Sequence, residues 1–398
     1  MMTNIEIKDQ ILDLRQFVKE GQLYKPVGDD ARIEAFLPPM GAENHGSNVI
    51  ELPNGDLACV WFGGDKEGAN NVNIVFSRLP KGATQWTTPA FLSNDPERSD
   101  QNPIIFVTPT SELWLMYASQ MSSGRGPSSW EEKINNNEVR GIHWMQWTSV
   151  IQRRISKDNG ETWGPVETLF DTPGSFCRNR MLVLSNGDWL FPMYYSRRDS
   201  EGVYGNDVSV MKISKDQGNS WTEHPIPNSQ GRVHPTVVEL GEGRLVCFFR
   251  SRSADRIYTS HSEDFGQNWS NAIRTELPNN NASIQAVKLE SGKIALAFNY
   301  LSVNDDPTKT IWPPDRYPLT IALSEDEGKT WPYMRHLDTG DGFFGPLNIH
   351  LNRCLAYPSI FQSKDKSIHV AYSYLGRQCI KYVRFDEEWI RGNRSRMY

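Results

Sequence analysis

The chain has 398 residues and a formal net charge of −6, so it offers no overall basic character for binding nucleic acid or an anionic membrane, and we expect neither as a partner. Its 24 Pro, 30 Gly and 13 Trp are typical of many short strands joined by tight turns. The five cysteines are far apart and lie in or beside apolar runs. We therefore expect reduced thiols, with neither a disulfide framework nor a zinc site.

The N-terminal residues 1–40 are expected to form a short amphipathic helix followed by a strand. Charged residues are scattered among the apolar positions of residues 1–21, so the segment lacks the continuous apolar stretch of a secretory signal. This pattern leads us to expect a cytoplasmic protein.

Six hairpin patterns follow along the chain, each with two apolar runs joined by a turn. They occupy residues 48–62, 104–118, 182–195, 236–249, 285–298 and 358–375. A third strand-like run follows each hairpin, and after the first five a characteristic turn leads on to a fourth run. The chain is thus predicted to contain six four-stranded units.

The characteristic turn has a shared spelling, SxDxGxxW, with a degenerate copy at residues 77–86. The four complete copies are Ser156–Trp163, Ser214–Trp221, Ser262–Trp269 and Ser324–Trp331. In such a turn the Asp accepts backbone N–H bonds, the Gly takes a positive φ, and the Trp packs between sheets. We interpret these boxes as folding elements and not as binding sites.

Four-stranded units that recur at roughly 50 to 75 residues are the signature of propeller blades. The sequence therefore predicts an all-β protein, a six-bladed β-propeller with Asp-box turns. Because no linker divides the chain, residues 1–398 are expected to form a single domain. The sixth unit has no box, so the N-terminal strand is expected to complete that unit and close the ring.

These boxes and hairpins resemble the sialidase (neuraminidase) superfamily, and residues 44–386 are similar to its bacterial and fungal branch of predicted neuraminidases. The resemblance implies a carboxylate-binding arginine group, of which Arg250 and Arg316 match two members, while His45 stands in the place of the third. It also implies that Tyr357 is the nucleophile and Asp65 the acid/base. His234 occupies the place of the glutamate that usually partners the tyrosine.

Further candidates come from sorting the loops by the face on which they open, because one face of a propeller carries the starts of the innermost strands. Many arginines at one mouth of an acidic chain predict a local anion site, unless they pair with nearby acids. Arg178 or Arg180 is a candidate for the missing third arginine. The substrate-binding candidates are Arg250, Arg316, Arg178, Arg180, Arg232, Gln101, Asn102 and Tyr300.

Two chemistries fit the catalytic candidates Tyr357, His234, Asp65 and His45. In a sialidase-like hydrolase, Tyr357 attacks the anomeric carbon, His234 accepts the phenol proton, and Asp65 protonates the leaving oxygen. In a polysaccharide lyase, the arginines neutralise a uronate, for example in a rhamnose-glucuronate linkage, and a His or Tyr removes the C5 proton. Hydrolysis is the first hypothesis, since Tyr357, Asp65 and two arginines are retained.

A glycan-binding propeller without catalysis is the third hypothesis, with tryptophans of the blade-two insertion as a stacking platform. The sequence contains no phosphate-binding glycine loop, nucleotide fingerprint or metal-ligand cluster, so we expect no cofactor and no metal. The partner predicted by all three hypotheses is an acidic oligosaccharide or glycoside.

Overall fold

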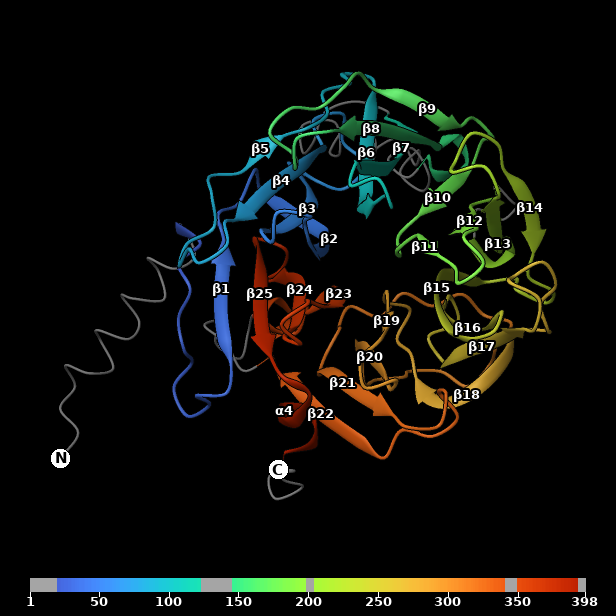
Figure 1. Cartoon of the computed structure of the whole chain (residues 1–398). Helices are drawn as coiled ribbons and strands as arrows, with labels where there is room; N and C mark the ends of the chain where they lie inside the picture. The colour runs from blue at the N-terminus through green and yellow to red at the C-terminus, as the bar shows by residue number, and fades with distance from the viewer. Residues whose placement is uncertain (1–19, 123–144, 198–203, 341–348, 393–398) are drawn as a thin grey trace, which may run out of the picture.

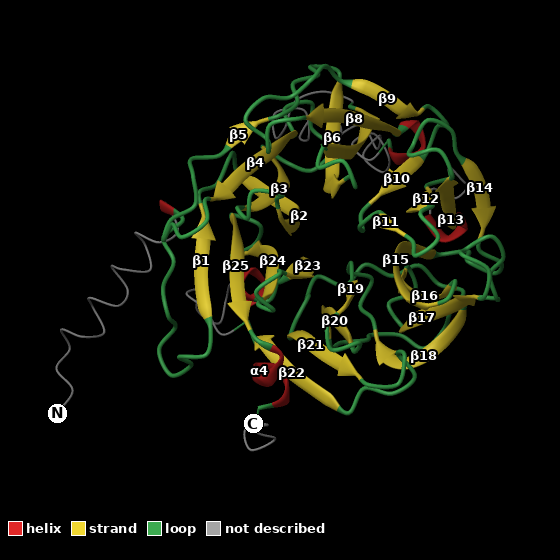
Figure 2. Ribbon diagram, viewed as in Figure 1, coloured by secondary structure: helices red, strands yellow, loops and turns green. Residues whose placement is uncertain are grey.

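A computed structural model of the protein describes residues 20–122, 145–197, 204–340 and 349–392, which form a six-bladed β-propeller (Figure 1). Six antiparallel sheets surround a central axis, and Figure 2 shows how few helical turns the ring contains. The predicted all-β class and blade number are confirmed. The helix expected near the N-terminus lies outside the described residues.

The blades follow the chain in order, with the innermost strand first in each. Blade one contains β2 (Glu43–Glu51), β3 (Leu57–Gly64), β4 (Asn73–Leu79) and β5 (Ala90–Phe91). Blade two contains β6 (Arg98–Val107), β7 (Leu113–Met121), β8 (Val150–Ser156) and β9 (Glu167–Phe170). Blade three contains β10 (Ser175–Cys177), β11 (Leu182–Val183), β12 (Trp189–Tyr195), β13 (Val208–Ser214) and β14 (Thr222–Pro225).

The second half of the ring repeats this order. Blade four contains β15 (Arg232–Gly241), β16 (Arg244–Ser251), β17 (Arg256–Ser262) and β18 (Ile273–Pro278). Blade five contains β19 (Gln285–Lys288), β20 (Ile294–Asn299), β21 (Leu319–Ser324) and β22 (Tyr333–Asp338). Blade six contains β23 (Ala356–Gln362), β24 (Ile368–Tyr374), β25 (Cys379–Phe385) and β1 (Ile33–Leu37). The short helices are η1 (Gln146–Thr148), η2 (Tyr204–Asn206), α3 (Ile349–Asn352) and α4 (Glu387–Arg391).

The Asp-box turns have the predicted internal bonds. In the first complete box, Asp158 accepts the Thr162 backbone N–H at 2.9 Å and its side-chain hydroxyl at 2.5 Å. Gly160 adopts a φ of 83° between them, a backbone conformation that favours glycine. Trp269, in the third box, is 7% exposed and packs in the core between blades three and four. The same bonds recur in the other boxes, which confirms their structural role.

The ring is closed by β1, which pairs with β25 from Ile33 opposite Arg384 to Leu37 opposite Ile380 (Figure 1). A buried ion-pair network reinforces this junction. Lys381 lies 3.1 Å from the Glu34 carboxylate on β1 and 3.2 Å from the Asp338 carboxylate on β22. Charges from β1, β22 and β25 are thus satisfied by one another, and they connect blades five and six to the closing strand.

Replacing Lys381→Ala is expected to lower the free energy of unfolding by about 3–5 kcal/mol, because two buried carboxylates would lose their cation. Urea denaturation followed by fluorescence measures this loss. Lys366→Ala is the matched control, since its ion pair with Glu290 is exposed, and it should cost no more than about 1 kcal/mol. Equal losses in the two variants would contradict the importance of the network for ring closure.

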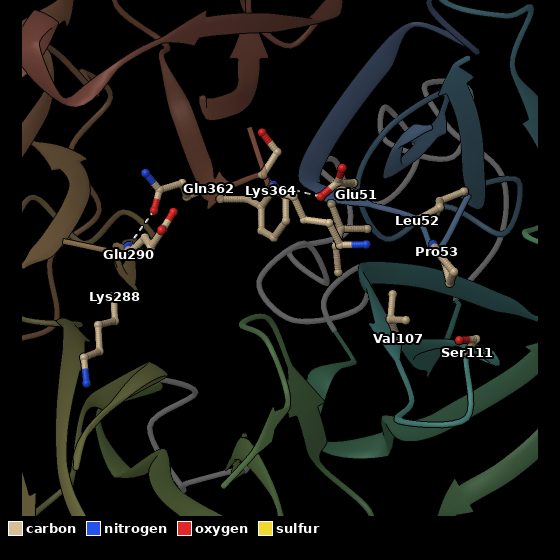
Figure 3. A pocket seen from close by; sticks show the side chains of 12 residues that line it. Glu51, Leu52, Pro53, Val107, Ser111, Lys288, Glu290, Gln362 and Lys364 are labelled. Atoms are coloured by element: carbon tan, nitrogen blue, oxygen red, sulfur yellow. Dashed lines mark hydrogen bonds between the residues drawn. The ribbon is translucent and has the colours of Figure 1, made fainter. Parts of the chain in front are cut away.

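A cavity of 610 Å³ lies at one end of the axis, among the turns that end the innermost strands of blades one, two, five and six. Figure 3 shows Glu51 beside Lys364 on one side of it and Glu290 beside Gln362 on another, and each pair is joined by a hydrogen bond. The Glu51 carboxylate and the Gln362 amide oxygen therefore each accept a backbone N–H from a neighbouring blade. Among the described residues, no helix has the length and apolarity needed to span a membrane.

Candidate active site

The opposite end of the axis is shaped by bulges in the innermost strands. In β6, β15 and β23 the pairing register shifts at an X-Pro step, and the residue before the proline has a positive φ. These residues are Asn102 (51°), His234 (51°) and Tyr357 (54°), called the X-Pro residues below. A bulge turns a side chain out of its ladder. The bulges therefore direct the side chains of His234 and Tyr357 toward a shared centre, and the same bulge recurs at Asn102.

Tyr357 occupies this centre and is 7% exposed. The His45 ring centroid lies 4.1 Å from the Tyr357 ring centroid, and the His234 ring approaches it edge-on at 5.3 Å. Arg250 Nη1 donates a hydrogen bond of 2.6 Å to the Tyr357 hydroxyl. The structure thus brings together three of the four catalytic candidates around one phenol.

Three guanidinium groups surround the phenol: those of Arg178, Arg250 and Arg316, called the arginine group below. Their Cζ atoms lie 5.5, 5.4 and 5.2 Å from the Tyr357 ring centroid. Each has a buried nitrogen without a hydrogen-bond partner among the described residues, namely Nε and Nη1 of Arg178, Nη2 of Arg250 and Nη1 of Arg316. Buried donors of this kind are expected to bind an anion, and planar guanidinium groups suit a carboxylate.

Neighbouring residues orient Arg250. Asn281, from the blade-five segment before β19, accepts a 2.8 Å hydrogen bond from Arg250 Nε. The indole of Trp312 lies 5.3 Å from Arg250 Cζ and is 39% exposed, so it lies beside the guanidinium. Sequence reasoning did not single out Trp312. Its position in the long β20–β21 connection gave no periodic signal that it would approach Arg250.

Two members of the arginine group, Arg250 and Arg316, favour the ionised form of the phenol. Burial alone would raise the pKa of Tyr357, but the positive charges of Arg250 and Arg316 outweigh it and lower this pKa below its ordinary value of 10. Burial, together with nearby arginines, lowers the pKa of His45 and His234 well below 6.5. At neutral pH both imidazoles are therefore uncharged, and the phenol ionises more readily than in a free tyrosine.

Arg250→Gln is expected to raise the pKa of Tyr357 by about one to two pH units, since a charge-assisted hydrogen bond contributes about 1.5–3 kcal/mol. Ultraviolet absorbance titration, with Tyr357→Phe subtracted as the blank, measures this change. Arg244→Gln serves as the control, because Arg244 pairs with Glu327 on the surface. An unchanged Tyr357 titration in Arg250→Gln would show that Arg250 does not stabilise the phenolate.

Asp65, the predicted acid/base, and Glu67 both lie on the segment that follows β3. The Asp65 side chain is exposed where β3 ends, whereas Glu67 lies near enough to influence the pKa of Tyr357. Glu67 forms an ion pair of 2.6 Å with Arg377, which also lies 3.4 Å from Glu43. Among the described residues, no carboxylate is hydrogen-bonded to the Tyr357 hydroxyl. Glu67 was not among the predicted site residues, although it follows Asp65 by only two positions.

Four substrate-binding candidates make other contacts. Arg180 donates to the carbonyls of Val49 and Ile360, further along the axis. Arg232 stacks on Tyr258, with its Cζ 3.8 Å from the ring centroid. The other two contact residues of their own blades. The Gln101 amide donates a hydrogen bond to the Ser99 hydroxyl, and the Tyr300 ring, 45% exposed, has its centroid 6.3 Å from that of the His336 ring. Of the two candidates for a third arginine, the structure therefore brings Arg178 to the phenol.

A sequence family described as BNR repeat-like domain matches residues 55–370. The chain belongs to this family. No curated protein sequence matches the BNR repeat-like chain. Among the described residues, no cluster of three or more His, Cys, Asp or Glu could hold a metal ion.

Solved structures share the fold of this BNR repeat-like protein at low identity. The Hadza microbial sialidase Hz136 is 17% identical, with a TM-score of 0.67 over 92% of this chain and 69% of that one. NanB sialidase from Streptococcus pneumoniae is 13% identical, with a TM-score of 0.66 over 88% and 69%. A protein of unknown function from Dyadobacter fermentans is 17% identical, with a TM-score of 0.66 over 88% and 97%. Identities this low establish the propeller fold alone.

Proposed function

We propose that this protein cleaves the glycosidic bond of a sugar that carries a carboxylate. One observation carries the proposal: three buried guanidinium groups surround a single phenol, and each retains a donor without a partner among the described residues. A carboxylate bound there would supply the counter-charge that the buried arginines need. The similarity to sialidases supports a glycan as the source of that carboxylate.

Hydrolysis is the first reaction we propose. The Tyr357 phenolate attacks the anomeric carbon and displaces the leaving sugar, and water then releases the glycosyl group from the tyrosine. His234, whose uncharged ring meets the Tyr357 ring edge-on at 5.3 Å between centroids, is the proposed acceptor of the phenol proton, while Arg250 stabilises the phenolate. Asp65 remains the proposed proton donor to the leaving oxygen, since it directly follows the last residue of β3.

Elimination from a uronic acid is the second candidate, and the two histidines favour it. His45 Nε2 and His234 Nδ1 are buried without partners among the described residues, and both rings face Tyr357. The arginine group would neutralise the uronate and so acidify its C5 proton. The phenolate or one imidazole would remove that proton, and a second group would protonate the departing oxygen.

The test is mass spectrometry of products from glycans that end in sialic acid, related nonulosonic acids or rhamnose-capped glucuronic acid. Under hydrolysis the product masses sum to the substrate plus one water, whereas under elimination they sum to the substrate and include an unsaturated uronate. Under hydrolysis, where Tyr357 is the nucleophile, Tyr357→Phe should lower turnover more than about a thousandfold. Tyr333→Phe, on the outermost strand of blade five, should leave it unchanged.

The same panel also includes outcomes that would contradict the proposal. Full activity in Tyr357→Phe would remove the phenol from the chemistry. Binding of these glycans without turnover of any of them would instead identify a glycan-binding propeller.

A further inference from the structure

We propose that Asn179 is a positioning residue, which holds His234 in the site from the neighbouring blade three. The inference rests on the proposed function only where it assigns His234 a part in the reaction. Asn179 lies at an interruption in blade three. The innermost strand there is split into β10, which ends at Cys177, and β11, which begins at Leu182. Residues 178–181 between them are outside the β12 ladder. Cys177, the last residue of β10, and the three residues after it, Cys177–Arg180, are called the axial segment below.

Three consecutive side chains of the axial segment donate to the three X-Pro residues. Cys177 Sγ lies 3.5 Å from the Asn102 carbonyl oxygen, Arg178 Nη2 lies 2.8 Å from that of Tyr357, and Asn179 Nδ2 lies 2.8 Å from that of His234. The last two donors also reach the following prolines, Pro358 at 3.4 Å and Pro235 at 3.1 Å. One short segment therefore contacts the bulges of blades two, four and six.

These bulges need such support. A positive φ is unfavourable for a residue with a side chain, and a following proline restricts the backbone further. Strained residues of this kind persist only where surrounding contacts determine their conformation. The amide and guanidinium donors contact His234 and Tyr357, while Asn102 receives only the weak thiol donor. The stronger bonds thus support the two residues with proposed chemical roles.

The orientation of the Asn179 amide is itself fixed. Asn179 Oδ1 accepts a 3.1 Å hydrogen bond from Gln285 Nε2, and Gln285 Oε1 accepts one of 2.7 Å from the Ile360 backbone N–H. Because these contacts occupy the amide oxygen, the amide nitrogen must point at the His234 carbonyl. Asn179 is 1% exposed, so water cannot easily replace this bond. The side chain therefore acts on the His234 backbone, and through it on the direction of the imidazole.

Asn179→Ala is expected to lower kcat by about tenfold to a hundredfold, since a small displacement of a reacting group can cost that much. KM should stay within about twofold of its original value, because the arginine group still binds the carboxylate. In a His234→Ala background, Asn179→Ala should cause no further loss, as expected for a residue that acts only through His234. Additive losses in that double variant would overturn the proposal.

Two further variants separate positioning from general stability. Ile213→Val removes one buried methyl group from the core between blades three and four, and it should leave kcat unchanged despite some loss of stability. Gln285→Glu keeps the acceptor for Ile360 but loses the donor to Asn179, so it should lower kcat in the same direction as Asn179→Ala. A fall in kcat with Ile213→Val equal to that of Asn179→Ala would show that stability alone explains the effect.

A readout without turnover distinguishes this proposal from the proposed function. The chain has eight histidines, so the imidazole NMR signals of His234 can be assigned by their loss in His234→Ala. Asn179→Ala should shift or broaden these signals, and Ile213→Val should not. If no glycan is cleaved but the His234 signals shift, the positioning role stands and the proposed reaction falls. Unchanged signals in Asn179→Ala would overturn the positioning role.

Discussion

The hydrogen bonds from the axial segment to the carbonyls of the X-Pro residues are the constraint on which the site depends. The inner edge of each blade presents backbone groups to the axis, and these groups need partners when they are buried. Arg178 and Asn179 supply those partners for blades six and four, and Arg180 does so for Val49 and Ile360. The same contacts that close the centre of the ring thus fix the backbones of Tyr357 and His234.

The buried charges of this chain divide into two kinds. Lys381 is paired with Glu34 and Asp338, and Arg252 forms an ion pair of 2.7 Å with Asp207, whose side chain is fully buried. The arginine group, in contrast, contacts amide, carbonyl and phenol oxygens and has no carboxylate partner among the described residues. A buried cation without a counter-charge is unfavourable, so this group is where a bound anion would contribute most. This contrast distinguishes the site from the ion pairs that stabilise the ring.

The fold was predictable because its signals are local. Each Asp box specifies a turn within eight residues, and each hairpin shows two apolar runs joined by a turn. The number of blades therefore followed from the number of hairpins. The site depends on contacts between blades, which spacing does not reveal. Arg178 and Arg180 are two positions apart, yet one reaches Tyr357 and the other reaches Ile360. The recurring X-Pro step at Asn102, His234 and Tyr357 was the available signal for the bulges, and the roles of Asn179 and Gln285 had none.

Hydrolysis and elimination place the same demand on the centre of this site. In a sialic acid the carboxylate is attached to the anomeric carbon, and in a uronic acid it is attached to C5. If the arginine group holds the carboxylate, the Tyr357 oxygen faces the carbon that bears it, because Arg250 contacts that oxygen and still has Nη2 for the anion. The phenolate would then attack the first carbon or deprotonate the second. The outcome therefore depends on whether the leaving oxygen is attached to that carbon or to its neighbour, and so on which protein group can protonate it.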